Sequence, residues 1–139
     1  MTAKEYLSQS RHLDLRINSK IQQVTSLNDL ATKATAVLTG MPHSPNRATS
    51  TMEEAITKII DLQSEINSDI DRLVDLKQKI TVTIKAVDNT EYQTLLEKRY
   101  LCFLSWEQIA VDMGYSIHHL YKLHSAALNI CDRILKEDT

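Results

Sequence analysis

The sequence predicts an all-α protein in which a long, coiled-coil-like antiparallel helical hairpin precedes a small bundle of short helices. Its 139 residues contain only two glycines and two prolines, and three of these four helix breakers fall together at Gly40, Pro42 and Pro45. Apolar residues recur at steps of three and four on both sides of that break, as in amphipathic helices. Six of the seven aromatic residues lie between residues 92 and 121, which is typical of a separate compact core.

The first predicted helix starts near the N-terminus, where Thr2 and Glu5 have the spacing of a capping box. Its apolar stripe is interrupted at Lys20 and ends near Gly40. The stripe consists of Leu13, Ile17, Val24, Leu27, Ala31, Ala34 and Leu38. We therefore expect one long amphipathic helix, followed by a connector over residues 40–50.

A second long helix is predicted after the connector, with Ser50 or Thr51 as its cap. Its apolar residues keep heptad spacing for about five heptads, with breaks at Gln63 and Lys77. The seam positions are Ile56, Ile59, Ile66, Ile70, Leu73, Ile80, Ile84 and Val87. A single helix cannot bury such a stripe, so the two stripes pack together within one chain or against a second chain. We expect a hairpin that also forms a homodimer.

Composition changes near residue 89, and we expect a hairpin domain over residues 1–88 and a second domain over residues 89–139. A new helix is predicted to start at Glu91 and Tyr92. The concentration of aromatic residues in the second domain favours a core of three or four short helices, because aromatic side chains bury a large area in a small domain.

The second domain carries the pattern of a helix-turn-helix. Ser105 is expected to cap a helix, with Gln108 three residues later as the second residue of a capping box. Gly114 suits the left-handed backbone conformation that ends this helix. Ser116 caps the next helix. Ile109 and Met113 of the first helix are expected in the core. The buried stripe predicted for the second helix is Leu120, Leu123, Ala127, Ile130 or Cys131, and Ile134.

The run from Leu95 to Leu128 resembles region 4 of sigma factors, the domain that reads promoter DNA. The resemblance rests on Leu-x-x-Arg-Tyr at residues 96–100, on the helix that starts at Ser105, and on Gly-x-Ser at residues 114–116. The whole layout is similar to small proteins of phages and prophages of Gram-positive bacteria, in which a long helical part precedes a sigma-like helix-turn-helix.

The resemblance implies that the helix opening at Ser116 enters the major groove of DNA. Its outward positions are then the ones that contact bases and phosphates. We expect these DNA-binding residues to be Ser116, Ile117, His118, His119, Tyr121, Lys122 and His124. Arg99, Trp106 and Gln108 are expected to assist at the DNA backbone, or Arg99 to pair with Glu97 or Glu107 as a structural residue.

The charge of the second domain departs from the sigma-factor pattern, in which recognition helices are rich in arginine. Residues 91–139 carry five basic and seven acidic side chains, and the whole chain has a net charge of −2. Neutralisation of phosphates supplies most nonspecific DNA affinity. We therefore expect weak binding by a monomer, and stronger binding by a dimer, with RNA polymerase or another host protein, or with protonated histidines.

Other classes of site are not expected. His118, His119 and His124 lie on one helix at spacings that do not converge on an ion, so no metal is predicted. Cys102 and Cys131 have no close Cys or His neighbours and are interpreted as reduced core residues. The sequence shows no phosphate loop and no nucleophile motif, so we expect no enzymatic activity and no cofactor. No apolar stretch suits a signal sequence or a bilayer span, which predicts a cytoplasmic protein of a bacterial host cell and no membrane partner.

Two functions follow from these observations. The first is a phage-type transcriptional regulator that binds DNA through its sigma-like helix-turn-helix, as a dimer or with RNA polymerase. The second is an interaction or assembly protein, such as an inhibitor of a host protein or a small terminase-like subunit, that uses the same fold. Fold alone does not decide between the two.

Overall fold

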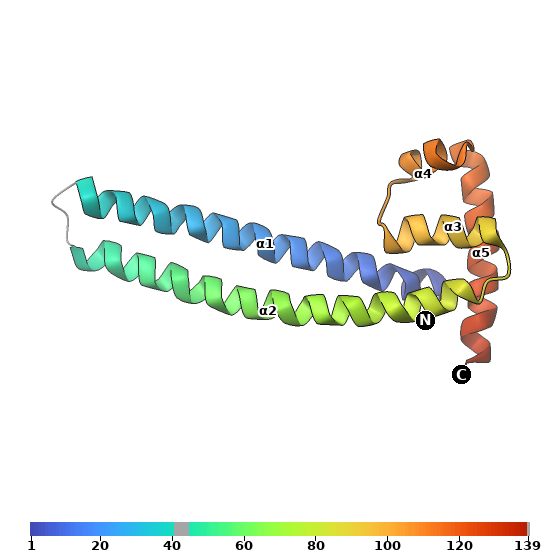
Figure 1. The fold of residues 1–139 in the computed structure, drawn as a ribbon, viewed down its shortest axis with the longest axis horizontal. Coiled ribbons are helices and arrows are strands. Elements are labelled where there is room, and N and C mark those ends of the chain that lie inside the picture. Colours follow the sequence, from blue (N-terminus) through green and yellow to red (C-terminus); the bar gives the residue numbers. More distant parts are fainter. Residues whose placement is uncertain (41–44, 139) are drawn as a thin grey trace. The chain divides into compact units, whose positions relative to one another are not determined.

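The computed structural model is all-α, as the sequence predicts (Figure 1). It describes residues 1–40 and 45–138, with side chains described for residues 1–34 and 50–138. Two long helices come first, α1 (Ala3–Gly40) and α2 (Pro45–Lys85). Four short elements follow, namely α3 (Thr90–Leu96), the π-helical turn η1 (Glu97–Leu101), α4 (Trp106–Met113) and α5 (Ile117–Glu137).

The chain divides into two compact units. The hairpin unit is Asp14–Arg72, and the terminal unit combines Met1–Leu13 with Leu73–Thr139. The division expected between residues 88 and 89 rests on the change in composition there. The units defined by packing instead divide within α1, after Leu13, and within α2, after Arg72. The first three turns of α1 therefore belong with the C-terminal helices.

The capping box at the start of α1 is confirmed. The Glu5 amide N–H donates to Thr2 Oγ1, and the Thr2 amide N–H donates to Glu5 Oε2, each over 3.2 Å. The expected end of α1 near Gly40 is also confirmed.

The expected start of α2 near Ser50 or Thr51 is wrong, since the helix already begins at Pro45. Proline is well tolerated in the first turn of a helix, because an amide N–H there has no helical partner to lose. Of the expected connector over residues 40–50, residues 41–44 lie outside the described residues.

In the hairpin unit, α1 and α2 run antiparallel (Figure 1), and each buries one apolar face. On α1 the expected stripe is confirmed, with Ile17 and Ala34 buried and Val24, Leu27 and Ala31 half-buried. Leu38 lies outside the residues whose side chains are described. The face of α1 that the sequence predicts to be buried is therefore the one that packs.

The seam predicted for the second long helix is confirmed at six of its eight positions, with Ile59, Ile66, Ile80, Ile84 and Val87 buried and Leu73 half-buried. It is wrong at Ile56 and Ile70, which are 46% and 41% exposed, and Gln63 is exposed as well. The seam takes the preceding residue at these positions, and the buried side chains there are Ala55, Leu62 and Asp69. Ile70 was predicted for the seam because it is the apolar residue at that step of the heptad pattern. The structure buries Asp69 instead, because Lys20 on α1 supplies its partner.

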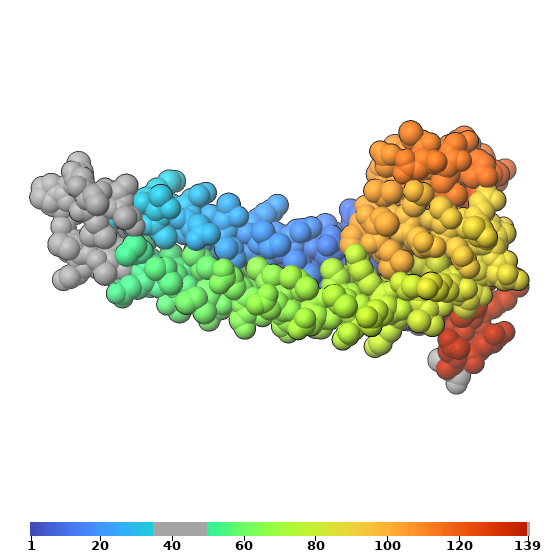
Figure 2. All heavy atoms as spheres, viewed as in Figure 1, coloured from blue at the N-terminus to red at the C-terminus, as the bar shows by residue number. Residues whose placement is uncertain are grey.

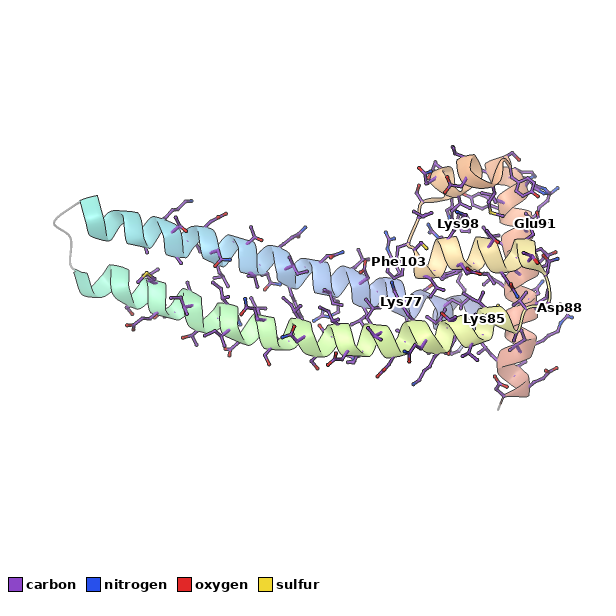
Figure 3. The ribbon with its side chains drawn as sticks, in the orientation of Figure 1. Lys77, Lys85, Asp88, Glu91, Lys98 and Phe103 are labelled. Atoms are coloured by element: carbon purple, nitrogen blue, oxygen red, sulfur yellow. The ribbon has the colours of Figure 1, made fainter. Side chains whose placement is uncertain are left out.

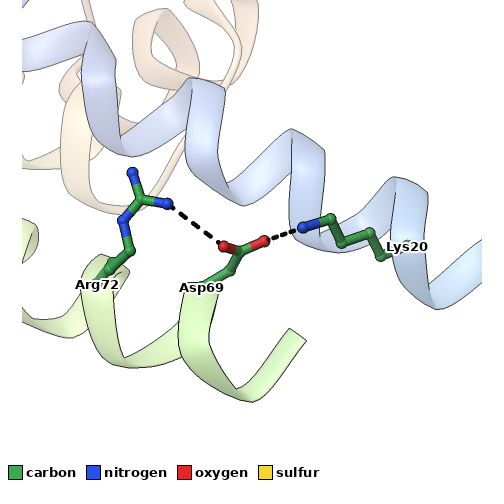
Figure 4. Close-up of polar contacts among 3 residues, drawn as sticks. All are labelled: Lys20, Asp69 and Arg72. Carbon is green, nitrogen blue, oxygen red and sulfur yellow. Dashed lines mark hydrogen bonds and ion pairs between the residues drawn. The ribbon is translucent and has the colours of Figure 1, made fainter. Parts of the chain in front are cut away.

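The Lys20 ammonium lies 2.6 Å from Asp69 Oδ2, and their side chains are only 13% and 9% exposed. Arg72, which is exposed, reaches the other oxygen of Asp69 at 3.5 Å (Figure 4). A buried ion pair stabilises little by itself but penalises arrangements that separate its partners. The pair thus fixes which residues of α1 and α2 lie opposite each other in the hairpin unit.

The terminal unit has a core built from segments far apart in sequence. Ala3 and Leu7 of α1 pack with Ile80 and Ile84 of α2. Val87, Leu96, Tyr100, Ala127 and Cys131 complete the same cluster. The Ala3 amide N–H donates to Asp132 Oδ1 over 2.7 Å, and the buried Ser10 hydroxyl donates to the Tyr100 carbonyl over 2.8 Å. The start of α1 is therefore part of the C-terminal core.

The short helices form a second cluster around Leu95, Ile109 and Leu120, all three fully buried. Asn89 caps α3 by accepting the Tyr92 amide N–H over 3.0 Å, which confirms the helix predicted at Glu91 and Tyr92. Figure 2 shows α3, η1 and α4, coloured yellow to orange, packed as one continuous body.

Phe103, in the loop between η1 and α4, has a positive φ of 60°, and within the described chain it is the one residue other than glycine to do so. This conformation costs a bulky residue about 1 kcal/mol. Two cations contact the ring. Lys77 Nζ lies 4.7 Å from its centroid (Figure 3), and the Arg11 guanidinium lies 5.8 Å from it. Arg11 Nη1 also donates to the Phe103 carbonyl over 2.9 Å. The strained loop is therefore fastened to both long helices.

None of the helices in the described part of the chain combines the length and the apolar composition needed to cross a bilayer.

Candidate nucleic-acid interface

Helices α4 and α5 and the glycine turn between them make a two-helix unit with the predicted caps. Ser105 Oγ accepts the Gln108 amide N–H over 3.2 Å, and Ser116 Oγ accepts the His119 amide N–H over 3.1 Å. Gly114 ends α4 with a φ of 73°, in the left-handed region. The Gln108 side chain does not complete a capping box, because it donates instead to Asp112 Oδ1 over 2.8 Å.

The inner faces of the two helices are close to the prediction. Ile109 and Leu120 are fully buried, and Met113 and Leu123 pack against them half-buried. This packing fixes the orientation of the first turns of α5. It also leaves a row of polar side chains on the opposite face of that helix.

Most of the expected DNA-binding residues lie on that outer face. His118, His119, Tyr121 and Lys122 are exposed, as is the capping residue Ser116. Ile117 is half-buried. The His119 ring contacts the Tyr115 ring edge-on, with centroids 4.7 Å apart.

His124 is the exception, because it is buried and points inward rather than toward solvent. The buried stripe of α5 runs through Leu120, His124, Ala127 and Cys131, at steps of four, three and four. Nε2 of His124 lies 2.7 Å from the Tyr100 hydroxyl oxygen, which satisfies the buried ring nitrogen. His124 was predicted to lie on the surface, because nothing in the sequence indicates that Tyr100 is its hydrogen-bond partner.

Burial sets the protonation states of the pair. It lowers the pKa of His124 to about 4, and the positive charges of Lys4 and Arg99 lower it further in the same direction. Burial also raises the pKa of Tyr100 to about 12, against the opposing effect of Arg99. His124 is therefore a neutral imidazole at physiological pH, hydrogen-bonded to a neutral phenol.

Trp106 is held between Arg99 and α5. The Arg99 guanidinium lies 4.6 Å from the indole centroid, and Arg99 Nη1 donates to the Leu104 carbonyl over 3.0 Å. On α5 the Tyr121 and His124 rings meet the indole edge-on at 5.3 Å and 4.6 Å. Arg99 therefore makes structural contacts with Leu104 and Trp106, and the ion pair expected with Glu97 or Glu107 is wrong.

Beside this cluster lies a cavity of about 540 Å³, called here the basic pocket. Lys4 and Arg11 of α1 line it together with Arg99, and its aromatic walls are Tyr100, Trp106 and Tyr121. His12 and His124 line it as well, and none of the described residues around it is acidic. It collects three permanent positive charges within the terminal unit.

Sequence reasoning missed the contribution of α1 to this site. Lys4, Arg11 and His12 look like ordinary solvated residues of an amphipathic helix. They join residues 99–125 only because Ala3, Leu7 and Ser10, on the buried face of the same turns, pack against the C-terminal helices. Nothing in the local sequence indicates that long-range contact.

The two cysteines differ in environment. Cys131 is buried, as expected, and burial raises the pKa of its thiol to about 11, with a further contribution from Asp132. Cys102 is exposed, so its expected place in the core is wrong. It caps the end of η1, where its amide N–H donates to the Glu97 carbonyl over 3.0 Å and its side chain faces away from the core. Across the described residues, no three His, Cys, Asp or Glu side chains are grouped so that they could hold a metal ion.

Comparison with known protein families, with curated proteins and with solved structures found no match. The resemblance to sigma region 4 therefore stands on the motifs in the sequence alone.

Proposed function

We propose that this protein is a DNA-binding transcriptional regulator of the phage type, in which α4 and α5 form a sigma-like helix-turn-helix and α5 is the recognition helix. The observation that carries the proposal is the exposed face at the start of α5. His118, Tyr121 and Lys122 project there from a helix whose opposite face is fixed by Ile109 and Leu120. In a helix-turn-helix the second helix lies in the major groove, with the residues of its N-terminal turns at the base edges.

The residues on this face suit both parts of DNA recognition. Lys122 offers a cation to phosphate, and the two histidines and Tyr121 offer hydrogen-bond donors and acceptors to base edges. Ser116 and the N-terminus of α5 add backbone N–H groups, which favour a phosphate at that end of the helix. Ile117, being half-buried, contributes an apolar edge.

We further propose that the protein acts as a homodimer or together with RNA polymerase. A dimer doubles the number of phosphate contacts and so offsets the low positive charge of residues 91–139. In the hairpin unit Ile56, Ile60 and Ile70 are 46%, 59% and 41% exposed on one face of α2. An exposed apolar stripe on a long helix is typical of an association surface.

DNA binding is tested by electrophoretic mobility shift at low salt, with wild-type protein and a His118→Ala, His119→Ala, Lys122→Ala triple variant. The expected result is retarded DNA with the wild type and loss of retardation with the variant, at unchanged helical content and sedimentation mass. No retardation by the wild type in its highest oligomeric state would overturn the proposal. Equal binding by the triple variant would show that α5 is not the recognition helix.

A second function, interaction with a host protein through the same fold, is favoured by the outer surface of α4. Val111 is 77% exposed there, with the acidic residues Glu107 and Asp112 on the same helix. The carboxylates on this surface repel the phosphates of DNA, so it suits a protein partner better than a nucleic acid. Retention of RNA polymerase on the immobilised wild type, lost with Val111→Asp, would support this function.

A further inference from the structure

The basic pocket adds what the recognition helix lacks, a concentration of positive charge. We propose that it holds a sugar-phosphate unit of the same DNA duplex that α5 reads, so that the first helix of the chain takes part directly in DNA binding. This inference rests on the proposed function of α5 and extends the interface to Lys4, Arg11 and Arg99.

Continuity of surface places the pocket next to the recognition face. Tyr121 and Ser125 of α5 line the pocket. His118 lies three residues before Tyr121 and Lys122 three residues before Ser125, so all four lie on the same side of the helix. DNA seated on the first turns of α5 therefore passes beside the mouth of the pocket. Proteins that read the major groove commonly hold the flanking backbone with residues outside the recognition helix.

The cations of the pocket are not neutralised by the protein. Within the described part of the chain, no carboxylate lines the cavity and no ion pair involves Lys4, Arg11 or Arg99. Arg11 donates one hydrogen bond to the Phe103 carbonyl, and Arg99 donates one to the Leu104 carbonyl. The other N–H groups of each guanidinium can donate to a phosphate. The effect of Lys4 and Arg99 on the pKa of His124 reflects the same positive potential.

The aromatic walls favour a sugar-phosphate unit over a hydrated inorganic ion. Trp106, Tyr100 and Tyr121 give the cavity an apolar side that can pack on deoxyribose and that strengthens charge interactions by excluding water. A cavity of about 540 Å³ has room for both the sugar and its phosphate. Each phosphate neutralised in this way adds to affinity and to salt dependence.

The decisive variant is Lys4→Gln, Arg11→Gln in the full-length protein. Both residues are exposed, but Arg11 also donates to the Phe103 carbonyl. Lys4→Gln alone is therefore measured as well, to separate loss of charge from loosening of the Phe103 loop. The matched control is Lys79→Gln, Arg133→Gln, which removes the same charge from exposed positions of the terminal unit outside the pocket. Lys4→Arg, Arg11→Lys keeps the charge and should restore binding. Circular dichroism and thermal unfolding establish that each variant is folded.

Two readouts are measured together. The first is the affinity for a short labelled duplex over a range of salt concentrations, from fluorescence anisotropy. The second is the emission of Trp106, the one tryptophan of the sequence, which lies in the pocket wall. We expect duplex DNA to change the Trp106 emission. The pocket variant should bind about tenfold more weakly, with a salt slope lower by about 1 to 2, and the control should bind like the wild type.

The outcomes separate this inference from the proposed function. If the wild type binds DNA but the pocket variant matches it in affinity, salt slope and Trp106 response, the pocket inference is wrong and the function of α5 stands. If the wild type binds no DNA but inorganic pyrophosphate changes the Trp106 emission, and the pocket variant abolishes that change, the pocket serves a free phosphate ligand and its assignment to DNA is wrong. If neither DNA nor pyrophosphate has an effect, both proposals fail.

Discussion

The hydroxyl oxygen of Tyr100 lies 2.7 Å from Nε2 of His124, and the two rings stack with their centroids 5.8 Å apart inside the terminal unit. The bond joins η1 to α5, and the Tyr100 carbonyl accepts the Ser10 hydroxyl of α1. Tyr100, in the wall of the basic pocket, thus links three elements.

Replacement of Tyr100 by Phe should lower the free energy of unfolding by about 1 to 2 kcal/mol, because it leaves a buried ring nitrogen of His124 without a partner. Chemical denaturation monitored by circular dichroism measures the change. Tyr92→Phe removes a hydroxyl from a half-buried tyrosine and is the control, with an expected change near zero. A Tyr100→Phe protein as stable as the wild type would show that the bond contributes nothing to folding.

Acid should destabilise the fold through His124. The unfolded chain takes up a proton near the ordinary pKa of 6.5, whereas burial delays protonation in the folded protein to about pH 4. Between these two pH values the unfolded state binds more protons than the folded state. The free energy of unfolding is therefore highest above pH 6.5 and decreases as the pH falls from 6.5 to about 4, by up to roughly 3 kcal/mol in total. Denaturation at several pH values measures the slope. His124→Gln should remove this part of it, and an identical slope in that variant would contradict the prediction.

The two thiols should react at very different rates. Cys102 is exposed, and Cys131 is buried with a pKa raised to about 11. Because only the thiolate attacks a disulfide reagent, native protein at pH 8 should release one equivalent of thionitrobenzoate quickly from Ellman's reagent, and the second only in denaturant. Cys102→Ser should abolish the fast phase. Two fast thiols in the wild type would mean that α5 is not packed as described.

The caps of the helix-turn-helix should contribute measurably to stability. Ser116→Ala removes the acceptor of the His119 amide N–H and should cost about 1 kcal/mol. Gly114→Ala should cost a similar amount through its φ of 73° alone, because an added Cβ meets nothing within 4 Å. Gly114→Asn, which tolerates the left-handed region better, should cost less. Thermal unfolding ranks the three variants, and a Gly114→Ala protein more stable than Gly114→Asn would refute the strain argument.

Removing one partner of the ion pair in the hairpin unit should destabilise the protein more than replacing both partners. Lys20→Met leaves Asp69 buried with only the longer contact to Arg72 and should cost about 2 kcal/mol. Lys20→Met combined with Asp69→Leu should recover most of that loss. Arg72→Gln is the control, with an expected cost below about 0.5 kcal/mol because Arg72 is exposed. A double variant no more stable than the single one would show that the charges themselves stabilise the hairpin.

The fold class and the helix-turn-helix were predictable because their signals are local. Capping residues, a glycine turn and apolar spacing act within one or two helical turns, so Ser105, Gly114 and Ser116 could be assigned from the sequence. The choice between Ile70 and Asp69 for the seam was not local, since it depended on Lys20, which is 49 residues away.

The candidate site was predictable only where it lies on one helix. The exposed row of α5 follows from helical periodicity, but the inward direction of His124 depends on a hydroxyl 24 residues earlier. The pocket depends on contacts between α1 and α5 across more than a hundred residues, such as Ala3 with Asp132. Long-range packing of this kind leaves no mark on spacing or composition.

The bond between Ala3 and Asp132 also has a consequence for synthesis on the ribosome. Residues 3–10 are made before their packing partners around residues 127–132, so the terminal unit cannot close until those later residues have emerged. The hairpin unit, whose partners are nearer in sequence, has no such delay. Until then Ala3 and Leu7 lack the part of their cover that Ala127 and Cys131 supply, and partly uncovered apolar side chains leave a nascent chain open to aggregation or to capture by a chaperone.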